Sequence, residues 1–337
     1  MYNNIQALRG IAAFMVVLFH MLGQFKAMNL SNSWYESIAQ FGYIGVDIFF
    51  VISGFVMAKT THNLANNPKN AIKFIQKRLL RIFLGYWPIL LFAIIVYALL
   101  IPDILAKKDI FSSVFLISTN LQKLVIGPSW SLTYELYFYL LLSLLLMSNF
   151  INKKVFLSLL AIIIVLKILF LQQSNQYLDF FLSHFLLEFI IGFFLFYLKK
   201  QLLSQYMLPI ILLLAITALT IGINLPIADD WTRVVTFGFF GVCIIALAIH
   251  LEDNKIFIAN GMVKKIGDAS YSLYIVHIIF VNLFYHSGLR NYLTGTPYSA
   301  IGFVLYLALI IYFSLLIYKY LEHPLYQKMV NRLKDAF

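Results

Sequence analysis

The sequence predicts an all-α, polytopic membrane protein with about ten transmembrane helices. Of its 337 residues, 62% are hydrophobic and only 12% are charged, whereas about 25% of the residues in an average soluble domain are charged. The hydrophobic residues gather in runs long enough to cross a hydrocarbon core of about 30 Å. Repeats and linker-like stretches are not evident, so residues 1–337 are predicted to form a single integral-membrane domain.

Ten apolar runs are predicted to be spans because each approaches the length that a transmembrane helix needs. The fifth and seventh are the shortest, and residues 110–126 are interpreted either as a loop or as a re-entrant or interfacial segment. The predicted spans are residues 5–25, 38–58, 82–101, 129–149, 156–172, 181–198, 207–223, 233–250, 267–287 and 298–320.

Basic residues predict how these spans are oriented. Most of the 25 Lys and Arg residues lie in loops on the side of the N-terminus, and Lys- and Arg-rich loops stay in the cytoplasm. Both termini are therefore predicted to be cytoplasmic. The same distribution explains the net charge of +11 as a topology signal, so we expect the lipid bilayer, and no nucleic acid, as the partner of these loops.

The first span carries two ionisable side chains, Arg9 near its start and His20 near its middle. An ionisable residue costs roughly 2.5–3.5 kcal/mol at the centre of a spanning helix, which makes it a functional-site hypothesis. Eleven residues at about 1.5 Å each place His20 about 16 Å deeper than Arg9. Imidazole titrates near neutral pH, so we predict that His20 is a catalytic base and that Arg9 serves it from the cytoplasmic end.

The second span holds Asp47 together with Gly42, Gly45 and Gly54. Glycines allow helices to approach closely or to unwind locally. Two interpretations of Asp47 stay open. Either a basic neighbour neutralises it in a packing face, or it orients His20 or an arginine, since a carboxylate can hold an imidazole in one tautomer.

Arg78 and Arg81 stand three residues apart where the third span begins, so they are predicted to share one helix face. A basic cluster at this place sets topology and contacts anionic lipid head groups. Two guanidinium groups also suit a ligand that carries phosphates. We therefore assign both arginines to the binding of such a ligand.

Residues 127–139 open the fourth span. Glu135 lies a little more than a turn inside, with Tyr137 beside it, and burying a carboxylate there is costly. Glu135 is predicted either to be catalytic or to form a structural salt bridge with Arg9 or Arg81.

The ninth span begins with several hydroxyl side chains, among them Tyr274, that can form hydrogen bonds across helices. His277 lies deeper; a lone histidine on an apolar helix is more often a packing residue than a catalyst, so it is a secondary candidate. Near the end of the chain, Glu322 and His323 are expected at the membrane interface. No spacing typical of metal ligands occurs, so no metal is expected.

Taken together, these segments resemble the integral-membrane acyltransferase-3 family, polytopic O-acyltransferases that modify bacterial sugars. The resemblance covers nearly the whole chain in order; it departs where the family usually has a proline soon after Arg81, because Pro88 comes later here. We expect a short, stand-alone form similar to the exopolysaccharide O-acetyltransferases. The matching pieces are Arg9 with His20 at an Arg-x10-His spacing, GVDIFFVISGF at 45–55, RLLR at 78–81, SWSLTYE at 129–135, SYSLYIVH at 270–277 and EHP at 322–324.

The resemblance implies acyl-coenzyme A, typically acetyl-coenzyme A, as a cytoplasmic co-substrate, a carbohydrate hydroxyl as acceptor, no permanently bound cofactor, and the bacterial inner membrane as location. His20, Glu135 and Asp47 are then the catalytic candidates, and whether an acyl-enzyme forms stays open. The candidates for donor and substrate binding are Arg9, Arg78, Arg81, Trp130, Ser131, Tyr137, Tyr274 and His277.

The alternative is a transporter or flippase for a glycolipid or polysaccharide, which would also need buried Arg, His and carboxylate side chains. Paired broken helices related by an internal repeat, which many transporters have, are not evident in the sequence. Thioester hydrolysis or acyl transfer that needs His20 would indicate an enzyme, and substrate movement without release of free thiol would indicate a transporter.

Overall fold

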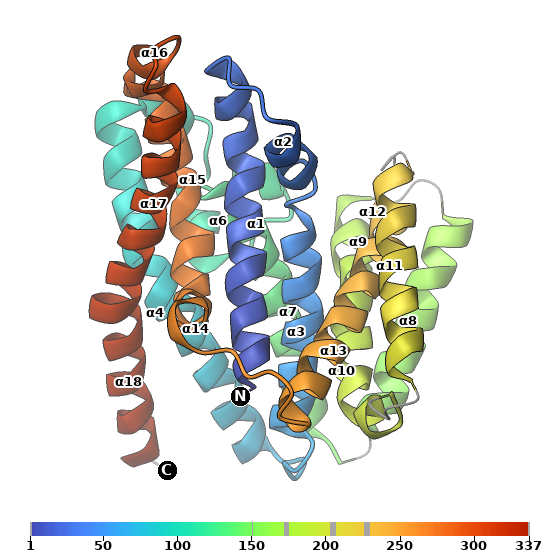
Figure 1. Cartoon of the computed structure of the whole chain (residues 1–337). Coiled ribbons are helices and arrows are strands. Elements are labelled where there is room, and N and C mark those ends of the chain that lie inside the picture. Colours follow the sequence, from blue (N-terminus) through green and yellow to red (C-terminus); the bar gives the residue numbers. More distant parts are fainter. Residues whose placement is uncertain (1, 150, 172–174, 203–206, 226–229, 336–337) are drawn as a thin grey trace. The chain divides into compact units, whose positions relative to one another are not determined.

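The computed structural model describes residues 2–149, 151–171, 175–202, 207–225 and 230–335 (Figure 1). Every regular element in these ranges is helical; η1 and η2 are 3₁₀ turns, and η3 and η4 are π-helical. The elements are α1 (Asn3–Ala27), α2 (Ser33–Ala39), α3 (Ile44–Thr61), α4 (Pro68–Leu100), α5 (Pro102–Leu105), α6 (Ile110–Phe115), η1 (Leu121–Lys123), η2 (Gly127–Ser129), α7 (Trp130–Met147), α8 (Lys153–Phe170), α9 (Gln176–Phe181), α10 (Phe185–Leu202), α11 (Leu208–Asn224), α12 (Asp230–Arg233), η3 (Val234–Gly238), α13 (Phe239–Asp253), α14 (Gly261–Asp268), α15 (Ser270–His286), α16 (Leu289–Leu293), α17 (Ser299–Ile317), η4 (Tyr318–Glu322) and α18 (His323–Asp335).

Seven helical segments within the described ranges are long and apolar enough to cross a membrane, and the bent pair α14–α15 makes an eighth if it counts as one span. The predicted all-α, polytopic class is therefore confirmed. The seven segments are Asn3–Ala27, Ile44–Thr61, Pro68–Leu100, Gly127–Met147, Gln176–Lys199, Trp231–Asp253 and Ser299–Arg332.

The predicted fifth and seventh spans are helices, but they stand outside these seven. Helix α8 includes Lys153, Lys154 and Lys167 among its 18 residues, and α11 has only 17 residues. Residues 110–126 contain the short elements α6 and η1. The predicted ninth span is bent by 72° between α14 and α15. The cytoplasmic location of both termini stays a prediction.

The chain divides into two compact units, each built from three separate segments. Helices α1, α3, α4 and α7 each contribute residues to both units. The single domain inferred from the sequence stays a prediction. The first unit consists of Met1–Arg9, Val46–Arg78 and Tyr134–Asn260, and the second of Gly10–Gly45, Leu79–Thr133 and Gly261–Phe337.

In the first unit, α3 and α10 touch through their backbones. A side chain added at Gly54 would overlap the carbonyl oxygen of Phe189, and one added at Gly192 would overlap that of Val51. This reciprocal contact confirms that the glycine pattern of α3 permits close helix approach. Helix α11 lies beside α13 (Figure 1).

In the second unit, two glycines let the segment before and at the start of α3 lie directly against α1. A Cβ atom at Gly42 would overlap the carbonyl oxygen of Met15, and one at Gly45 would overlap that of Ala12. Helix α15 lies beside α17 (Figure 1). This packing fixes the part of α1 that carries His20 against its neighbours.

Candidate active site

The second unit brings two of the predicted histidines together. His20 lies on α1 and is half-buried, whereas His277 lies on α15 and is fully buried. Nε2 of His277 is 3.2 Å from Nδ1 of His20, and the centres of the two rings are 5.0 Å apart. His277 is thus in direct contact with the predicted catalytic base, although the sequence made it only a secondary candidate.

A backbone carbonyl determines the tautomer of His20. Nδ1 of His20 lies 2.9 Å from the carbonyl oxygen of Val16, one helical turn earlier. A carbonyl oxygen only accepts hydrogen bonds, so Nδ1 carries the proton and donates it. A neutral imidazole has a single N–H, which leaves the lone pair on Nε2. His20 can therefore act as a base through Nε2 while Nδ1 remains bonded to its own helix.

Two hydrogen bonds join η2 and the start of α7 to α15 in the same unit. The Tyr274 hydroxyl donates to the carbonyl oxygen of Pro128 at 2.9 Å and lies 2.9 Å from Oγ of Ser131. The ring of Tyr274 is 6.0 Å from that of His277. The predicted binding residues Ser131 and Tyr274 thus connect to the histidine pair, and Trp130 is half-buried at the first position of α7.

Glu322 has a buried hydrogen-bond partner that the sequence did not predict. Its carboxylate is buried, with 4% of the residue exposed, and it accepts a hydrogen bond of 2.6 Å from the hydroxyl of Ser272 on α15. Glu322 therefore lies in the packed interior of the second unit, and its location at the membrane interface stays a prediction. His323, the next residue, is exposed and lies 3.0 Å from the side-chain amide of Gln327.

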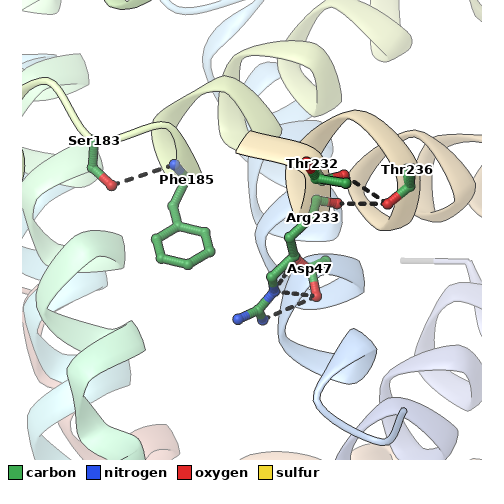
Figure 2. A network of polar contacts seen from close by, with 6 residues as sticks. All are labelled: Asp47, Ser183, Phe185, Thr232, Arg233 and Thr236. Atoms are coloured by element: carbon green, nitrogen blue, oxygen red, sulfur yellow. Dashed lines mark hydrogen bonds and ion pairs between the residues drawn. The ribbon is translucent and has the colours of Figure 1, made fainter. Parts of the chain in front are cut away.

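The first unit contains a buried ion pair between α3 and α12 (Figure 2). Nε of Arg233 is 2.9 Å from Oδ1 of Asp47, and Nη2 is 3.0 Å from Oδ2, so the pair is bidentate. The Asp47 side chain is completely buried and that of Arg233 is 12% exposed. The Arg233 guanidinium also lies 5.1 Å from the centre of the Phe185 ring. The pairing with Arg233 fits both interpretations of Asp47, because a basic neighbour can neutralise the carboxylate and the carboxylate can orient an arginine.

Glu135 occupies a second polar cluster of the first unit. Its Oε1 accepts a hydrogen bond of 2.8 Å from the hydroxyl of Ser53 on α3 and another from the hydroxyl of Tyr139, one turn later on α7. The guanidinium of Arg78 lies 5.7 Å from the centre of the Tyr139 ring. Tyr137 points to a different partner, because its hydroxyl donates to the carbonyl oxygen of Phe181 at 3.3 Å.

Arg78 also reaches the edge of a cavity of about 310 Å³ in the first unit. Nη2 of Arg78 donates a hydrogen bond of 2.9 Å to Oγ1 of Thr60, which lines the cavity. Nζ of Lys59 lies 4.9 Å from the centre of the Tyr2 ring at the same cavity. Burial, with help from a hydrogen bond to Asp253, raises the pKa of Tyr2 to about 12. Tyr2 is therefore an uncharged part of the cavity lining at neutral pH, with the ammonium group of Lys59 over its ring.

Arg9 and Arg81, the two remaining arginines predicted to bind the donor, each lie near one polar or aromatic side chain. Nη1 of Arg9 lies 3.4 Å from Oε1 of Gln6, and the guanidinium of Arg81 lies 5.7 Å from the centre of the Tyr326 ring in the second unit. The prediction that Asp47 or Glu135 orients His20 stays a prediction. Among the residues that the structure describes, no three His, Cys, Asp or Glu side chains group as metal ligands would.

Sequence reasoning missed three of these polar partners. The sequence predicts no role for Arg233, the first residue of the predicted eighth span, and it includes Ser53 only within the GVDIFFVISGF segment. Tyr139 could have been found, because side chains four residues apart on a helix are neighbours and Glu135 stands four residues before it. No local spacing relates Arg233 to Asp47, which lies 186 residues earlier.

The sequence of this chain is similar to a known protein family and to individual bacterial proteins. A family model described as an acyltransferase domain matches residues 2–319. The chain is 24% identical over 329 residues to the O-acetyltransferase OatA of Staphylococcus aureus (strain NCTC 8325 / PS 47), a match that covers 85% of this chain and 52% of OatA. It is 27% identical over 310 residues to the exopolysaccharide production protein ExoZ of Rhizobium meliloti (strain 1021), covering 85% of this chain and 90% of ExoZ. The chain thus spans about half the length of OatA. No solved structure matches.

Proposed function

This chain belongs to the acyltransferase-3 family, and we propose that it is a membrane O-acyltransferase of the bacterial inner membrane. The donor is acyl-coenzyme A on the cytoplasmic side, with acetyl as the acyl group, and the acceptor is a hydroxyl of a cell-surface or exported carbohydrate. The names of the relatives support this choice, since one is an O-acetyltransferase and the other an exopolysaccharide production protein.

The observation that carries the proposal is the tautomer of His20 inside a spanning helix. A sugar hydroxyl is a poor nucleophile at neutral pH and needs a positioned base, which contributes typically 10²–10⁴-fold to the rate. Because Nδ1 of His20 donates to the Val16 carbonyl, Nε2 offers the lone pair to the hydroxyl proton. The hydroxyl oxygen then bonds to the acyl carbon, the carbon–sulfur bond of the thioester breaks, and the imidazolium returns its proton to the departing thiolate.

The side chains around the cavity of the first unit support the choice of a phosphorylated donor. Arg78 is bonded to Thr60 at the cavity edge, and Lys59 lies over the aromatic ring of Tyr2. A guanidinium and an ammonium group beside an aromatic wall suit a ligand with phosphates and a planar base. We assign this cavity to the donor, and donor binding by Arg9 and Arg81 stays a prediction from the sequence.

Purified protein in liposomes with labelled acetyl-coenzyme A and an oligosaccharide acceptor tests the proposal. We expect release of free thiol and label on the acceptor, and we expect His20→Gln to abolish both while acetyl-coenzyme A still binds. Glutamine can form hydrogen bonds but is not a base, so the loss should fall on kcat. His286→Gln is the matched control, because His286 is an exposed histidine of α15, and it should keep full activity.

Two outcomes would contradict the proposal. A normally inserted His20→Gln protein that retains substantial activity would remove His20 from its role. Movement of a glycolipid or polysaccharide across the liposome membrane without thiol release would instead indicate a transporter or flippase.

A further inference from the structure

His277 directly contacts His20 within the second unit. It has no exposed surface, and burying a polar ring is costly unless its nitrogens are paired. Both nitrogens of His277 do have neighbours, since Nδ1 is 3.2 Å from the carbonyl oxygen of Leu273 and Nε2 is 3.2 Å from Nδ1 of His20. These two neighbours therefore determine which nitrogen of His277 carries a proton.

The two backbone carbonyls select one pattern. The carbonyl of Leu273 can only accept, so Nδ1 of His277 carries a proton, just as Nδ1 of His20 carries the proton that faces Val16. A neutral His277 then has its lone pair on Nε2, which faces the N–H of His20. Any arrangement with a proton on Nε2 of His277 would place two N–H groups against each other or leave a lone pair facing a carbonyl oxygen.

From this geometry we propose that His277 is a positioning residue that accepts a shared hydrogen bond from Nδ1–H of His20. The inference rests on the proposed function, in which His20 takes a proton at Nε2. When that proton arrives, the positive charge spreads over the ring, and Nδ1–H becomes a charge-assisted donor to the neutral His277. His277 itself neither gains nor loses a proton; it keeps the imidazolium oriented and stabilised until the proton leaves.

The effect of losing this acceptor follows from the hydrogen bond it makes. A hydrogen bond to a charged group contributes about 1.5–3 kcal/mol, which corresponds to a rate effect of about 10- to 100-fold. The bond strengthens only while His20 is charged, so its loss should lower kcat and leave the KM of donor and acceptor unchanged.

Two polar substitutions separate this role from others. In His277→Gln the side-chain amide reaches approximately the place of Nε2 and can accept from His20. In His277→Asn the amide reaches only the place of Nδ1, where it can still donate to the Leu273 carbonyl. Both variants preserve polarity at a buried position. We expect His277→Gln to stay within about fivefold of the wild type and His277→Asn to lose about 10- to 100-fold in kcat.

The measurement is kcat and KM for both variants in the liposome assay, with size-exclusion chromatography to verify folding. Equal activity of wild type and His277→Asn would overturn the inference, because His277 would then only fill space. A His277→Gln protein as inactive as His277→Asn would also overturn it, because His277 would then have to exchange a proton itself. Absence of any transfer by the wild type would instead refute the proposed function, so the two failures are distinguishable.

Discussion

Replacing Asp47 by Asn tests the buried ion pair of the first unit. The substitution keeps the size of the side chain but removes its charge, which leaves the Arg233 guanidinium without its counterion (Figure 2). Exposed ion pairs contribute about 0–1 kcal/mol, but the Asp47 side chain is completely buried and that of Arg233 is 12% exposed. Breaking a buried pair costs about 3–5 kcal/mol.

The surroundings of Arg233 determine where within about 3–5 kcal/mol the loss in free energy of unfolding should fall. The Phe185 ring, 5.1 Å from the guanidinium, still offers a cation–π contact of about 0.5–2 kcal/mol to Arg233 in the variant. We therefore expect the free energy of unfolding to fall by about 3 kcal/mol in Asp47→Asn. Removing both charges in Asp47→Asn/Arg233→Gln should cost less than the sum of the single changes, because no buried charge remains.

Titration with a denaturing detergent in mixed micelles measures these free energies as a double-mutant cycle. Asp103→Asn is the matched control, since Asp103 is exposed, and its effect should stay within about 0.5 kcal/mol. A loss below about 1 kcal/mol in Asp47→Asn, or strict additivity of the two single changes, would refute the reasoning that this pair is buried and coupled.

The remaining predictions concern three other places. Glu135→Gln should lower kcat by at least about tenfold without loss of stability, because the amide can still accept the hydrogen bonds from Ser53 and Tyr139 while the charge is gone; kinetics and thermal unfolding measure both. Gly54→Ala should reduce the free energy of unfolding by about 1–3 kcal/mol, because the new methyl group would overlap a backbone carbonyl; the detergent titration measures it. Arg78→Ala should raise the KM for acyl-coenzyme A more than it lowers kcat, and Arg78→Lys should recover only part, because an ammonium group lacks the bidentate fork.

The following results would contradict the predictions for Glu135 and Arg78, and a second glycine provides a control for Gly54. Full activity of Glu135→Gln would make Glu135 a structural residue. Gly23→Ala is the matched control for Gly54, because nothing lies within 4 Å of a Cβ atom added at Gly23, and it should not destabilise the protein. Unchanged donor affinity in a folded Arg78→Ala/Arg81→Ala protein would leave both arginines as topology signals only.

The class of this protein and the positions of its helices could be predicted from the sequence. A bilayer offers no hydrogen-bond partners to an exposed backbone, so apolar runs of this length must be helical, and most predicted spans coincide with helices of the structure. The same physics made His20, Asp47 and Glu135 candidates for functional residues, because placing an ionisable side chain inside an apolar run is costly whatever its partners are. The contact of Gly54 with another helix could likewise be expected from its size alone.

Only the tertiary structure determined which side chains meet. Local spacing on a helix can relate residues three or four apart, as it does for Glu135 and Tyr139. The partners of His20 and Asp47 lie 257 and 186 residues away in the chain. These pairings depend on which faces of α1, α3, α12 and α15 pack together, and the uniformly apolar surfaces of spanning helices carry little periodic signal about that choice. The tautomer of His20 depends on its own helix, because Nδ1 donates to the carbonyl of Val16, whereas the contact between His20 and His277 depends on the packing of α1 against α15.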